Sequence, residues 1–328
     1  MEIKNLKILA QEELVEKLTG QSYEHLNHYL AMYSSWFGGI IKNPAFMLVP
    51  VDDHMVHRGD GVFEAVKCVN GKLYLFDRHL DRLVNSARTI KLDLPVSLDD
   101  LKNIVVETVR AGGERDAVVR IFVSRGPGGF SADPAECVGA QVYVVVTKPV
   151  LPPKEHYEQG VTVKQSNIPM KPAHIAHIKT CNYLYSVLMS LEAHEKKVDF
   201  TVSVDNDGCL GEGPTENIAI VTNRYEFLVP KFGKVLRGTT VTRAMELAGE
   251  LLKMKVLTRI AEECIPVEEV YRAHEVMMFG TTFDVLPVVK FDGKKIGSGQ
   301  PGPFYKKFLK LIREDMENNP SVSTPVFQ

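Results

Sequence analysis

Apolar positions recur with two different periods along this chain, and together they predict a mixture of strands and helices. Apolar runs rich in valine and aromatic residues, typical of strands, occupy residues 117–124 and 141–147. Apolar residues three and four positions apart predict helices over residues 77–90, with Asp77 as the N-terminal cap, and over 97–110. Strands interspersed with amphipathic helices indicate the α/β (α+β) class.

Turn residues separate several of these elements. Asn70-Gly71 lies between the runs 57–66 and 73–76, and both residues of such a turn must accept a positive φ angle. Asp205–Gly208 and Asp292-Gly293 predict two further hairpin turns. The chain therefore contains at least three places where a strand turns back on itself.

The leading part of the chain predicts helices and then strands. Residues 10–18 form a helical pattern that Gly20 closes, and residues 23–33 predict a second helix. Residues 36–40 and 46–50 are the first strand candidates. This segment is interpreted as a surface appendage, with a cover over a subunit interface or a ligand site as the alternative.

A helical pattern also follows the segment that contains Lys179. Its apolar positions, Leu184, Val187, Leu188 and Leu191, are spaced for one face of a helix. We expect this face to be packed, so that Lys179 is held at the edge of a rigid element. Residues 302–316 predict a closing amphipathic helix.

Length and composition predict two domains. The chain has 328 residues, of which 45% are hydrophobic, enough to bury a large core. A proline-rich stretch reads as the linker. The predicted divisions are an N-terminal extension with the first strand (1–45), a small domain (46–147), the linker (148–160) and a large domain (161–328).

Charge and cysteine content exclude several classes of function. The net charge of −2 gives no reason to expect nucleic acid or an anionic membrane as partner. No apolar run is long enough to span a bilayer, and the N-terminus lacks a signal-peptide core. The five cysteines are not spaced as metal ligands, so we expect no metal site and reduced thiols in a cytoplasm.

Three groups in the second half of the chain are candidates for chemistry. Lys179 precedes a helix, and a lysine amine reacts with an aldehyde only when burial or nearby cations lower its pKa. Glu212 stands between two glycines that let the backbone approach a ligand closely. Gly238-Thr239-Thr240 begins a helix, whose free N–H groups and dipole favour a phosphate.

A lysine, a glutamate and a Gly-Thr-Thr helix start, in this order and spacing, resemble the pyridoxal-phosphate enzymes of fold type IV. These enzymes are branched-chain aminotransferases, D-amino-acid aminotransferases and aminodeoxychorismate lyases. The resemblance extends from about residue 49 to about residue 312. It implies a small N-terminal α/β domain, a larger C-terminal domain on a β-barrel-like sheet with helices, a homodimer, and pyridoxal 5'-phosphate as cofactor.

The resemblance also implies roles for individual residues. Lys179 would carry the cofactor as a Schiff base and then move a proton, and Glu212 would keep the ring nitrogen protonated. Arg82 would hold the phosphate with its planar guanidinium group, which can donate two hydrogen bonds to one phosphate. The implied cofactor positions are Arg82, Lys179, Glu212, Gly238, Thr239, Thr240 and Thr281. The implied substrate positions are Phe63, Arg120, Thr281 and Thr282.

Several positions depart from the family patterns. Val118 stands where branched-chain aminotransferases have a tyrosine two residues before the arginine that Arg120 matches. Phe130 and Ala132 replace the arginine and histidine with which D-amino-acid enzymes trap the substrate carboxylate. Val241 replaces an arginine near the phosphate, with Arg243 two residues later, and Phe283 stands where smaller residues are common, which could narrow the pocket.

The sequence therefore predicts an aminotransferase that acts on a small amino acid, branched-chain-like or D-alanine-like, and a 2-oxo acid. An alternative is a lyase that releases pyruvate from aminodeoxychorismate, although Glu64-Ala65 stands where these lyases often carry threonines. A catalytically idle cofactor-binding protein is the third reading. The chirality of the substrate stays open, because this fold serves both L- and D-substrates.

Overall fold

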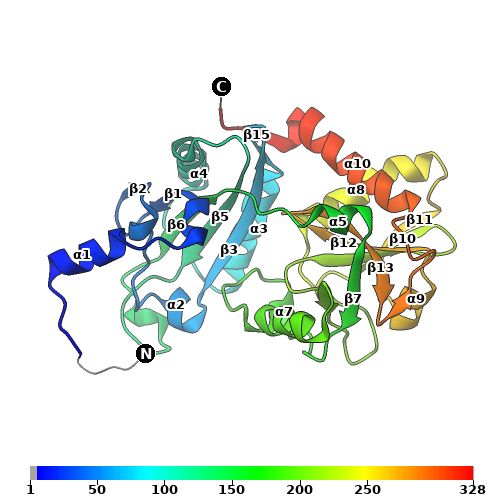
Figure 1. Ribbon diagram of the computed structural model, residues 1–328, viewed down its shortest axis with the longest axis horizontal. Helices are drawn as coiled ribbons and strands as arrows, with labels where there is room; N and C mark the ends of the chain where they lie inside the picture. The colour runs from blue at the N-terminus through cyan, green and yellow to red at the C-terminus, as the bar shows by residue number, and fades with distance from the viewer. Residues whose placement is uncertain (1–5, 328) are drawn as a thin grey trace.

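Two β-sheets, each covered by helices, form the body of the protein in the computed structural model, which describes residues 6–327 (Figure 1). The first sheet has seven antiparallel strands in the order β15-β4-β3-β5-β6-β1-β2. Its strands are β1 (Tyr29–Ser34), β2 (Gly39–Ile41), β3 (Gly61–Val69), β4 (Lys72–Tyr74), β5 (Ala117–Ser124), β6 (Gln141–Thr147) and β15 (Ser323–Pro325).

The second sheet is mixed and curls into a half-barrel. Its order is β11-β10-β9-β12-β13-β7-β8, with β14 paired to β13, and its parallel pairs are β10 with β11, β13 with β7 and β7 with β8. Its strands are β7 (Val161–Gln165), β8 (Phe200–Val202), β9 (Asn217–Val221), β10 (Glu226–Pro230), β11 (Arg259–Glu263), β12 (Glu275–Gly280), β13 (Asp284–Phe291) and β14 (Lys294–Lys295). The predicted α/β class with a barrel-like second sheet is confirmed.

Helices flank both sheets. The α-helices are α1 (Gln11–Thr19), α2 (His54–Arg58), α3 (Phe76–Thr89), α4 (Leu98–Gly112), α5 (Lys154–Glu158), α6 (Ala173–Ala176), α7 (Leu184–Lys196), α8 (Thr239–Lys253), α9 (Val267–Arg272) and α10 (Pro303–Asn318). The 3-10 helices are η1 (Glu24–His28), η2 (Pro44–Phe46), η3 (Pro134–Glu136) and η4 (Pro320–Val322). Within residues 6–327, no helix is long and apolar enough to cross a membrane.

Three hydrophobic cores follow from this layering. The first lies between one face of the first sheet and helices α3 and α4, and the second lies between the second sheet and helices α8 and α10. The third covers the other face of the second sheet. Along β12, Met277 and Phe279 enter the second core while Val276 and Met278 enter the third. This alternation is the strand period of two, and it explains why β12 is apolar throughout.

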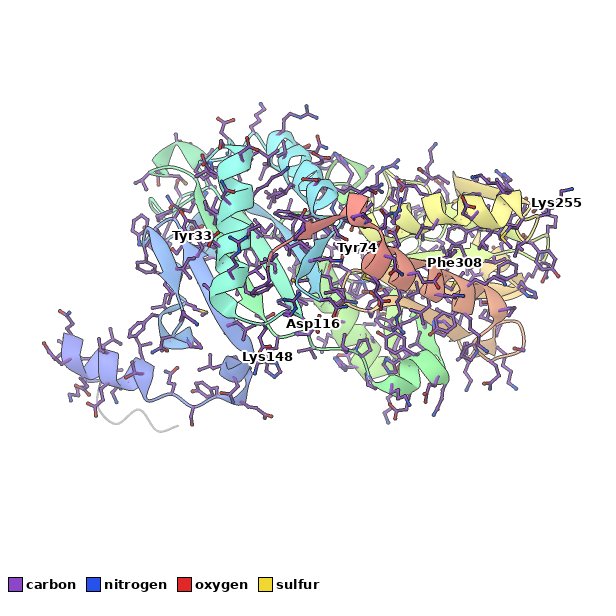
Figure 2. All side chains as sticks on the ribbon, turned by 90° about the horizontal axis from the view of Figure 1, so that it is seen from above. Tyr33, Tyr74, Asp116, Lys148, Lys255 and Phe308 are labelled. Atoms are coloured by element: carbon purple, nitrogen blue, oxygen red, sulfur yellow. A yellow bond between two sulfur atoms is a disulfide. The ribbon has the colours of Figure 1, made fainter. Side chains whose placement is uncertain are left out.

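The two sheets are joined by polar contacts as well as by packing. Lys67 on β3 lies 2.6 Å from Asp284 on β13, and the Tyr74 hydroxyl donates to Asp315 at 2.7 Å. Tyr74 also belongs to the second core together with Phe308 (Figure 2). Strand β15, near the C-terminus, returns to the first sheet. The exact domain divisions at residues 46, 148 and 161 remain a prediction.

Most element predictions in the body of the chain are confirmed. Strands β5 and β6 have the predicted bounds, and helices α4 and α10 begin and end within two residues of theirs. Asn70 and Gly71 have φ angles of 52° and 80°, as the turn between β3 and β4 requires. The helix pattern over 77–90 is also correct, but Asp77 is not its cap: the helix begins at Phe76 after Leu75.

Beyond α1, the leading segment was predicted correctly only in part. Residues 23–33 form η1 and strand β1 instead of one helix, because β1 pairs with β6 and buries Ala31 and Met32. Of the predicted strand 36–40, Gly39 and Ile40 lie in β2, whereas Trp36 and Phe37 lie exposed in a turn. Residues 47–50 form no regular element. Over such short runs, periodicity alone does not separate helix from strand, and tertiary pairing decides.

Two further expectations are corrected. On α7, the apolar positions Leu184, Val187, Leu188 and Leu191 are 39–61% exposed, while the opposite side of the helix, with Met189 and Ala193, is buried. Cys209 and Cys264 form a disulfide, whereas the sequence predicted only reduced thiols. The two cysteines are 55 positions apart in the sequence, and only the pairing of distant segments brings them together.

Candidate active site

Lys179 is held by the edge of strand β3 and not by the apolar face of α7. The N–H of Phe63 donates to the Lys179 carbonyl at 3.0 Å, and the N–H of Cys181 donates to the Gly61 carbonyl at 2.8 Å. The Lys179 N–H donates to the Ser86 hydroxyl at 3.2 Å. These backbone contacts fix the root of the lysine side chain against a rigid strand.

The Lys179 amine lies in a buried, partly aromatic environment. It donates to the Tyr183 hydroxyl at 3.2 Å and lies 4.5 Å from the centre of the Phe63 ring. Burial, reinforced by the Arg82 cation, lowers the pKa of Lys179 to about 8. About a tenth of this amine is therefore uncharged at pH 7 and able to attack an aldehyde, far more than for an unperturbed lysine.

A buried ion cluster lies beside the lysine. Arg82 donates to both carboxylate oxygens of Glu64, from Nε at 2.6 Å and from Nη2 at 2.7 Å, and its Nη1 donates to the Arg237 carbonyl at 2.9 Å. Burial raises the pKa of Glu64, but Arg82 and His79 outweigh it and hold that pKa well below its usual range. Three of the five guanidinium N–H groups are thus used, and two remain for a ligand.

His79 connects this cluster to helix α8. Its Nδ1 lies 2.6 Å from Glu64 and its Nε2 lies 3.2 Å from the Thr239 hydroxyl. Burial lowers the pKa of His79, so the ring is neutral at pH 7. Because an ionised Glu64 can only accept, Nδ1 carries the proton and Nε2 accepts from Thr239. The Thr239 hydroxyl proton is therefore directed to His79, and Thr239 retains its backbone N–H for an anion.

The start of α8 offers unpaired N–H groups. Gly238 precedes the helix, no side chain caps it, and its first turn contains no acidic residue. Thr239 and Thr240 are both buried there. A Cβ atom at Gly238 would overlap the side-chain oxygen of Asn217, so only glycine fits this position. With the two free N–H groups of Arg82, this helix start has the donors that a phosphate needs.

Glu212 is oriented by two donors. One carboxylate oxygen accepts from Lys171 at 3.2 Å, and the other accepts from the Leu236 N–H at 2.9 Å. The flanking Gly211 and Gly213 have no room for a Cβ atom, because Ser203 and Glu216 lie against them. Glu212 also acts electrostatically on Lys179 and Tyr183, which places it in the same charged neighbourhood.

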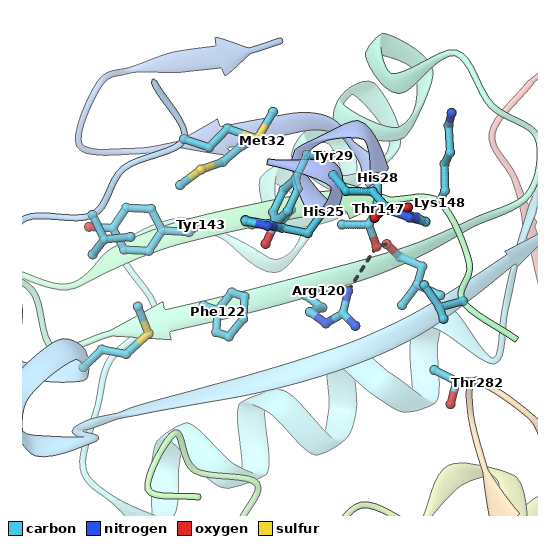
Figure 3. Close-up of a pocket in the computed structure, with 17 residues that line it drawn as sticks. His25, His28, Tyr29, Met32, Arg120, Phe122, Tyr143, Thr147, Lys148 and Thr282 are labelled. Carbon is cyan, nitrogen blue, oxygen red and sulfur yellow. Dashed lines mark hydrogen bonds between the residues drawn. The ribbon is translucent and has the colours of Figure 1, made fainter. Parts of the chain in front are cut away.

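A cavity of about 840 Å³ lies on the face of the first sheet opposite α3 and α4 (Figure 3). Val118, Arg120 and Phe122 all line it, as strand alternation predicted. Phe122 stacks on Phe63 with ring centres 5.7 Å apart, and Phe63 contacts Lys179. Phe63 therefore lies between the amine and Phe122 of the cavity wall.

The loop between β12 and β13 meets this cavity through Thr282. Thr281 precedes it in the same loop. Phe283 does not line the cavity, contrary to the expectation that it could narrow the pocket: it is 5% exposed and belongs to the third core. Its ring packs against Gly280 and Phe200.

The structure adds site residues that were not singled out. Tyr183 contacts the lysine amine, His79 joins Glu64 to Thr239, and Lys171 pairs with Glu212. Tyr183 is four positions after Lys179, in the segment that leads into the helix, so the sequence itself could have indicated that it lies near the lysine. Lys171 and His79 carried no comparable signal, because their partners are 41 and 160 positions away.

Comparison with known proteins agrees with this geometry. Residues 61–291 match the family model described as amino-transferase class IV. A D-amino-acid transaminase, chloroplastic, from Arabidopsis thaliana is 38% identical, with 96% of this chain and 84% of the relative covered. A putative branched-chain-amino-acid aminotransferase from Methanocaldococcus jannaschii is 31% identical, with 81% and 90% covered.

Solved structures show the same fold. The branched-chain amino acid aminotransferase of Thermobaculum terrenum, crystallised in its PLP-form, superposes with a TM-score of 0.79 at 18% identity, covering 92% of this chain and 100% of that one. The family match spans most of the chain and includes the lysine, the buried ion cluster and the start of α8. The chain belongs to the class IV aminotransferases, which use pyridoxal 5'-phosphate as cofactor.

Proposed function

We propose that Lys179 carries the pyridoxal 5'-phosphate of this enzyme and that the amino group moves between a small amino acid and a 2-oxo acid. The observation that carries this proposal is the Lys179 amine, which is buried, has a pKa lowered to about 8 and lies beside a phosphate-type donor set. The relatives named as D-amino-acid and branched-chain aminotransferases support a branched-chain-like or D-alanine-like substrate.

The residues present fit the cofactor. The backbone N–H groups after Gly238, the side chain of Thr240 and the free guanidinium donors of Arg82 suit the phosphate, with Thr281 as a further hydroxyl. Glu212 suits the ring nitrogen, because a carboxylate stabilises a nearby proton. When bound, pyridoxal phosphate acts as an electron sink that makes the Cα proton of an amino acid acidic.

The chain's own groups then perform the proton transfer. A neutral Lys179 amine would accept the proton released at the substrate Cα and would hold it for return to the product. The pKa of Tyr183 is raised to about 12 by burial, so its hydroxyl remains protonated and can orient the amine by hydrogen bonding. Phe63 and Phe122 form an apolar wall beside the amine, which limits its access to water.

Borohydride reduction in the presence of pyridoxal phosphate, followed by peptide mapping, tests the assignment. We expect one labelled peptide that contains Lys179. Label on another lysine would contradict the proposal. An assay with both enantiomers of alanine, with branched-chain amino acids and glutamate, and with aminodeoxychorismate would identify the reaction. Pyruvate release from aminodeoxychorismate without amino-group exchange would favour the lyase.

We also propose a homodimer that covers the exposed face of α7. Leu184, Val187, Leu188 and Leu191 form an apolar stripe that begins five residues after Lys179. Contiguous exposed apolar residues of this kind are typical of subunit interfaces. Sedimentation should show a dimer for the native chain and a monomer for Val187→Glu/Leu191→Glu, whereas Glu195→Ala on the same helix should leave the dimer intact. A monomeric native chain at micromolar concentration would overturn this proposal.

The cytoplasmic location predicted from the sequence stays a prediction. The Cys209–Cys264 disulfide is of a kind that is rare in reducing compartments, and the name of the Arabidopsis relative places that protein in the chloroplast. Fractionation of the producing cells would give the location of the protein. Thiol labelling of Cys209 and Cys264 would show whether the disulfide forms there.

A further inference from the structure

Lys171 and Lys179 lie in one short segment that leads from β7 to α7. Pro172 fixes the backbone immediately after Lys171, because its ring locks φ. The N–H groups of Ile175 and Ala176 both donate to the Pro172 carbonyl at 2.9 Å, and this begins the short helix α6. Lys179 follows soon after that helix. The two lysines are therefore placed by the same piece of local structure.

Both lysine amines approach the same aromatic ring. The Lys171 Nζ lies 5.3 Å and the Lys179 Nζ 5.7 Å from the centre of the Tyr183 ring. The Lys171 Nζ also lies 3.2 Å from Glu212 Oε1, and only 18% of the lysine side chain is exposed. Lys171 does not line the cavity on the first sheet. It therefore belongs to the Glu212 side of the site and not to that cavity.

The main chain of Glu212 is fixed more firmly than its carboxylate. The Glu212 N–H donates to the Ser203 hydroxyl at 3.1 Å, and the Glu212 carbonyl accepts from the Ser203 N–H at 3.0 Å. The carboxylate has only two donors, Lys171 on one oxygen and the Leu236 N–H on the other. Loss of the Lys171 amine would leave a single contact, about which the carboxylate can rotate.

Within residues 6–327, Lys171 is the only charge partner of Glu212. The space next to the carboxylate is a cavity of about 10 Å³, which admits one water at most. Glu216, a second acid, is buried near it: burial raises the pKa of Glu216 to about 7, and the charge of Glu212 adds to this rise. Two acids thus share this part of the site with one cation, so no neighbouring group replaces Lys171.

We propose that Lys171 is a positioning residue that holds the Glu212 carboxylate in the orientation in which it accepts a hydrogen bond from the ring nitrogen of the cofactor. This inference rests on the proposed function, in which Glu212 suits that nitrogen. Each carboxylate oxygen has two lone pairs, so Lys171 and Leu236 leave one on each oxygen for the ring. The effect of Lys171 is then confined to the ring nitrogen, because other residues suit the aldehyde and the phosphate.

The test compares two cofactors that differ only at the ring nitrogen. Pyridoxal phosphate and its carbocyclic analogue, in which a C–H group replaces this nitrogen, carry the same aldehyde and phosphate. Fluorescence titration of the cofactor-free protein gives the Kd of each. Lys171→Met keeps an unbranched side chain but removes the charged donor. We expect the Kd of pyridoxal phosphate to rise about tenfold, the usual cost of one charged hydrogen bond, and the Kd of the analogue to change less than about twofold.

Lys171→Arg keeps a cationic donor and should recover most of the tenfold difference. Lys234→Met is the matched control, because Lys234 lines the same small space but pairs with Asp205 and Asp207. It should change neither Kd by more than about twofold. In a Glu212→Gln background, Lys171→Met should have no further effect, since the two residues act as one unit.

An unchanged Kd of the analogue also shows that the Lys171→Met protein is folded. Equal rises for the two cofactors would mean that Lys171 is merely structural and would overturn the inference. No rise for either cofactor, or equal Kd values of the two on the native protein, would overturn it as well. If the native protein does not bind pyridoxal phosphate, the proposed function itself fails.

Discussion

The cofactor side and the substrate side of this site are built on different principles. Around Lys179, polar groups are buried and paired: Glu64 is fully enclosed and contacts both Arg82 and His79. In the cavity, Arg120 makes one side-chain hydrogen bond, and the histidines of η1 are exposed. One side is organised before any ligand arrives, whereas the other leaves its donors free. The groups around Lys179 are thus held in fixed positions, whereas the groups in the cavity can adjust to a ligand.

Removal of the lysine amine should have the largest effect. Lys179→Ala removes both the attachment point and the proton carrier, so we expect kcat to fall by at least about 10³-fold. Steady-state transamination measures this loss, and absorbance of the bound cofactor reports the attachment separately. Lys253→Ala, at an exposed lysine near the end of α8, serves as the control and should retain full activity. If Lys179→Ala retains more than a tenth of the native activity, the proposed role of Lys179 as attachment point and proton carrier is wrong.

Two glutamates that pair with arginines of α3 allow the cofactor side to be compared with the surface. Glu64→Gln leaves the buried Arg82 without a charge partner and should destabilise the cofactor-free protein by about 3 to 5 kcal/mol. Glu246→Gln breaks two ion pairs near the surface, with Arg78 and with Arg243, and should cost only about 1 kcal/mol. Urea unfolding gives both values. Similar losses for the two variants would show that the buried cluster is not specially important for stability.

Arg120→Leu should affect only the substrate side. We expect kcat/KM for the amino acid substrate to fall by about 10- to 100-fold, because hydrogen bonds to its carboxylate are lost. The Kd of pyridoxal phosphate, followed by fluorescence titration, should change less than about twofold. Arg88→Leu on the exposed side of α3 is the control. A large loss of cofactor affinity in Arg120→Leu would mean that the two sides are not separable.

The smallest expected effect is a pH dependence of cofactor capture. Since the pKa of Lys179 is lowered to about 8, its reactive neutral form increases about tenfold between pH 6 and pH 7 and levels off above pH 8. Stopped-flow mixing with pyridoxal phosphate should give a rate with this profile. An unperturbed lysine would instead give a rate that rises up to about pH 10. That second profile would contradict the buried, cation-flanked setting of the amine.

The sequence predicted the strands and turns whose signals are local. Asn70-Gly71 must form a tight turn, and the runs at β5 and β6 are too strongly apolar and β-branched to be anything but buried strands. It was wrong where a short run had two readings. Residues 23–33 form η1 and β1 because β1 pairs with β6. A pattern of that length does not show which distant strand will pair with it.

The same division applies to the site. Lys179, Glu212 and the Gly238 helix start could be singled out because each is a compact motif with its own chemistry. The Glu64–His79–Thr239 chain could not, because one of its two hydrogen bonds joins residues 160 positions apart. The α7 stripe shows the limit most clearly: its period correctly gave a helix, but burial depends on what lies against that face.

The sequence by itself determined the helices and strands with strong periods, the tight turns, the family and the residue types that can do the chemistry, since these depend on neighbours in the chain. Tertiary structure alone decided which charges are paired, which apolar face stays exposed and that the leading segment forms a wall of the cavity. Those features depend on contacts between distant segments, whose free energy comes from burial and pairing that no local pattern encodes.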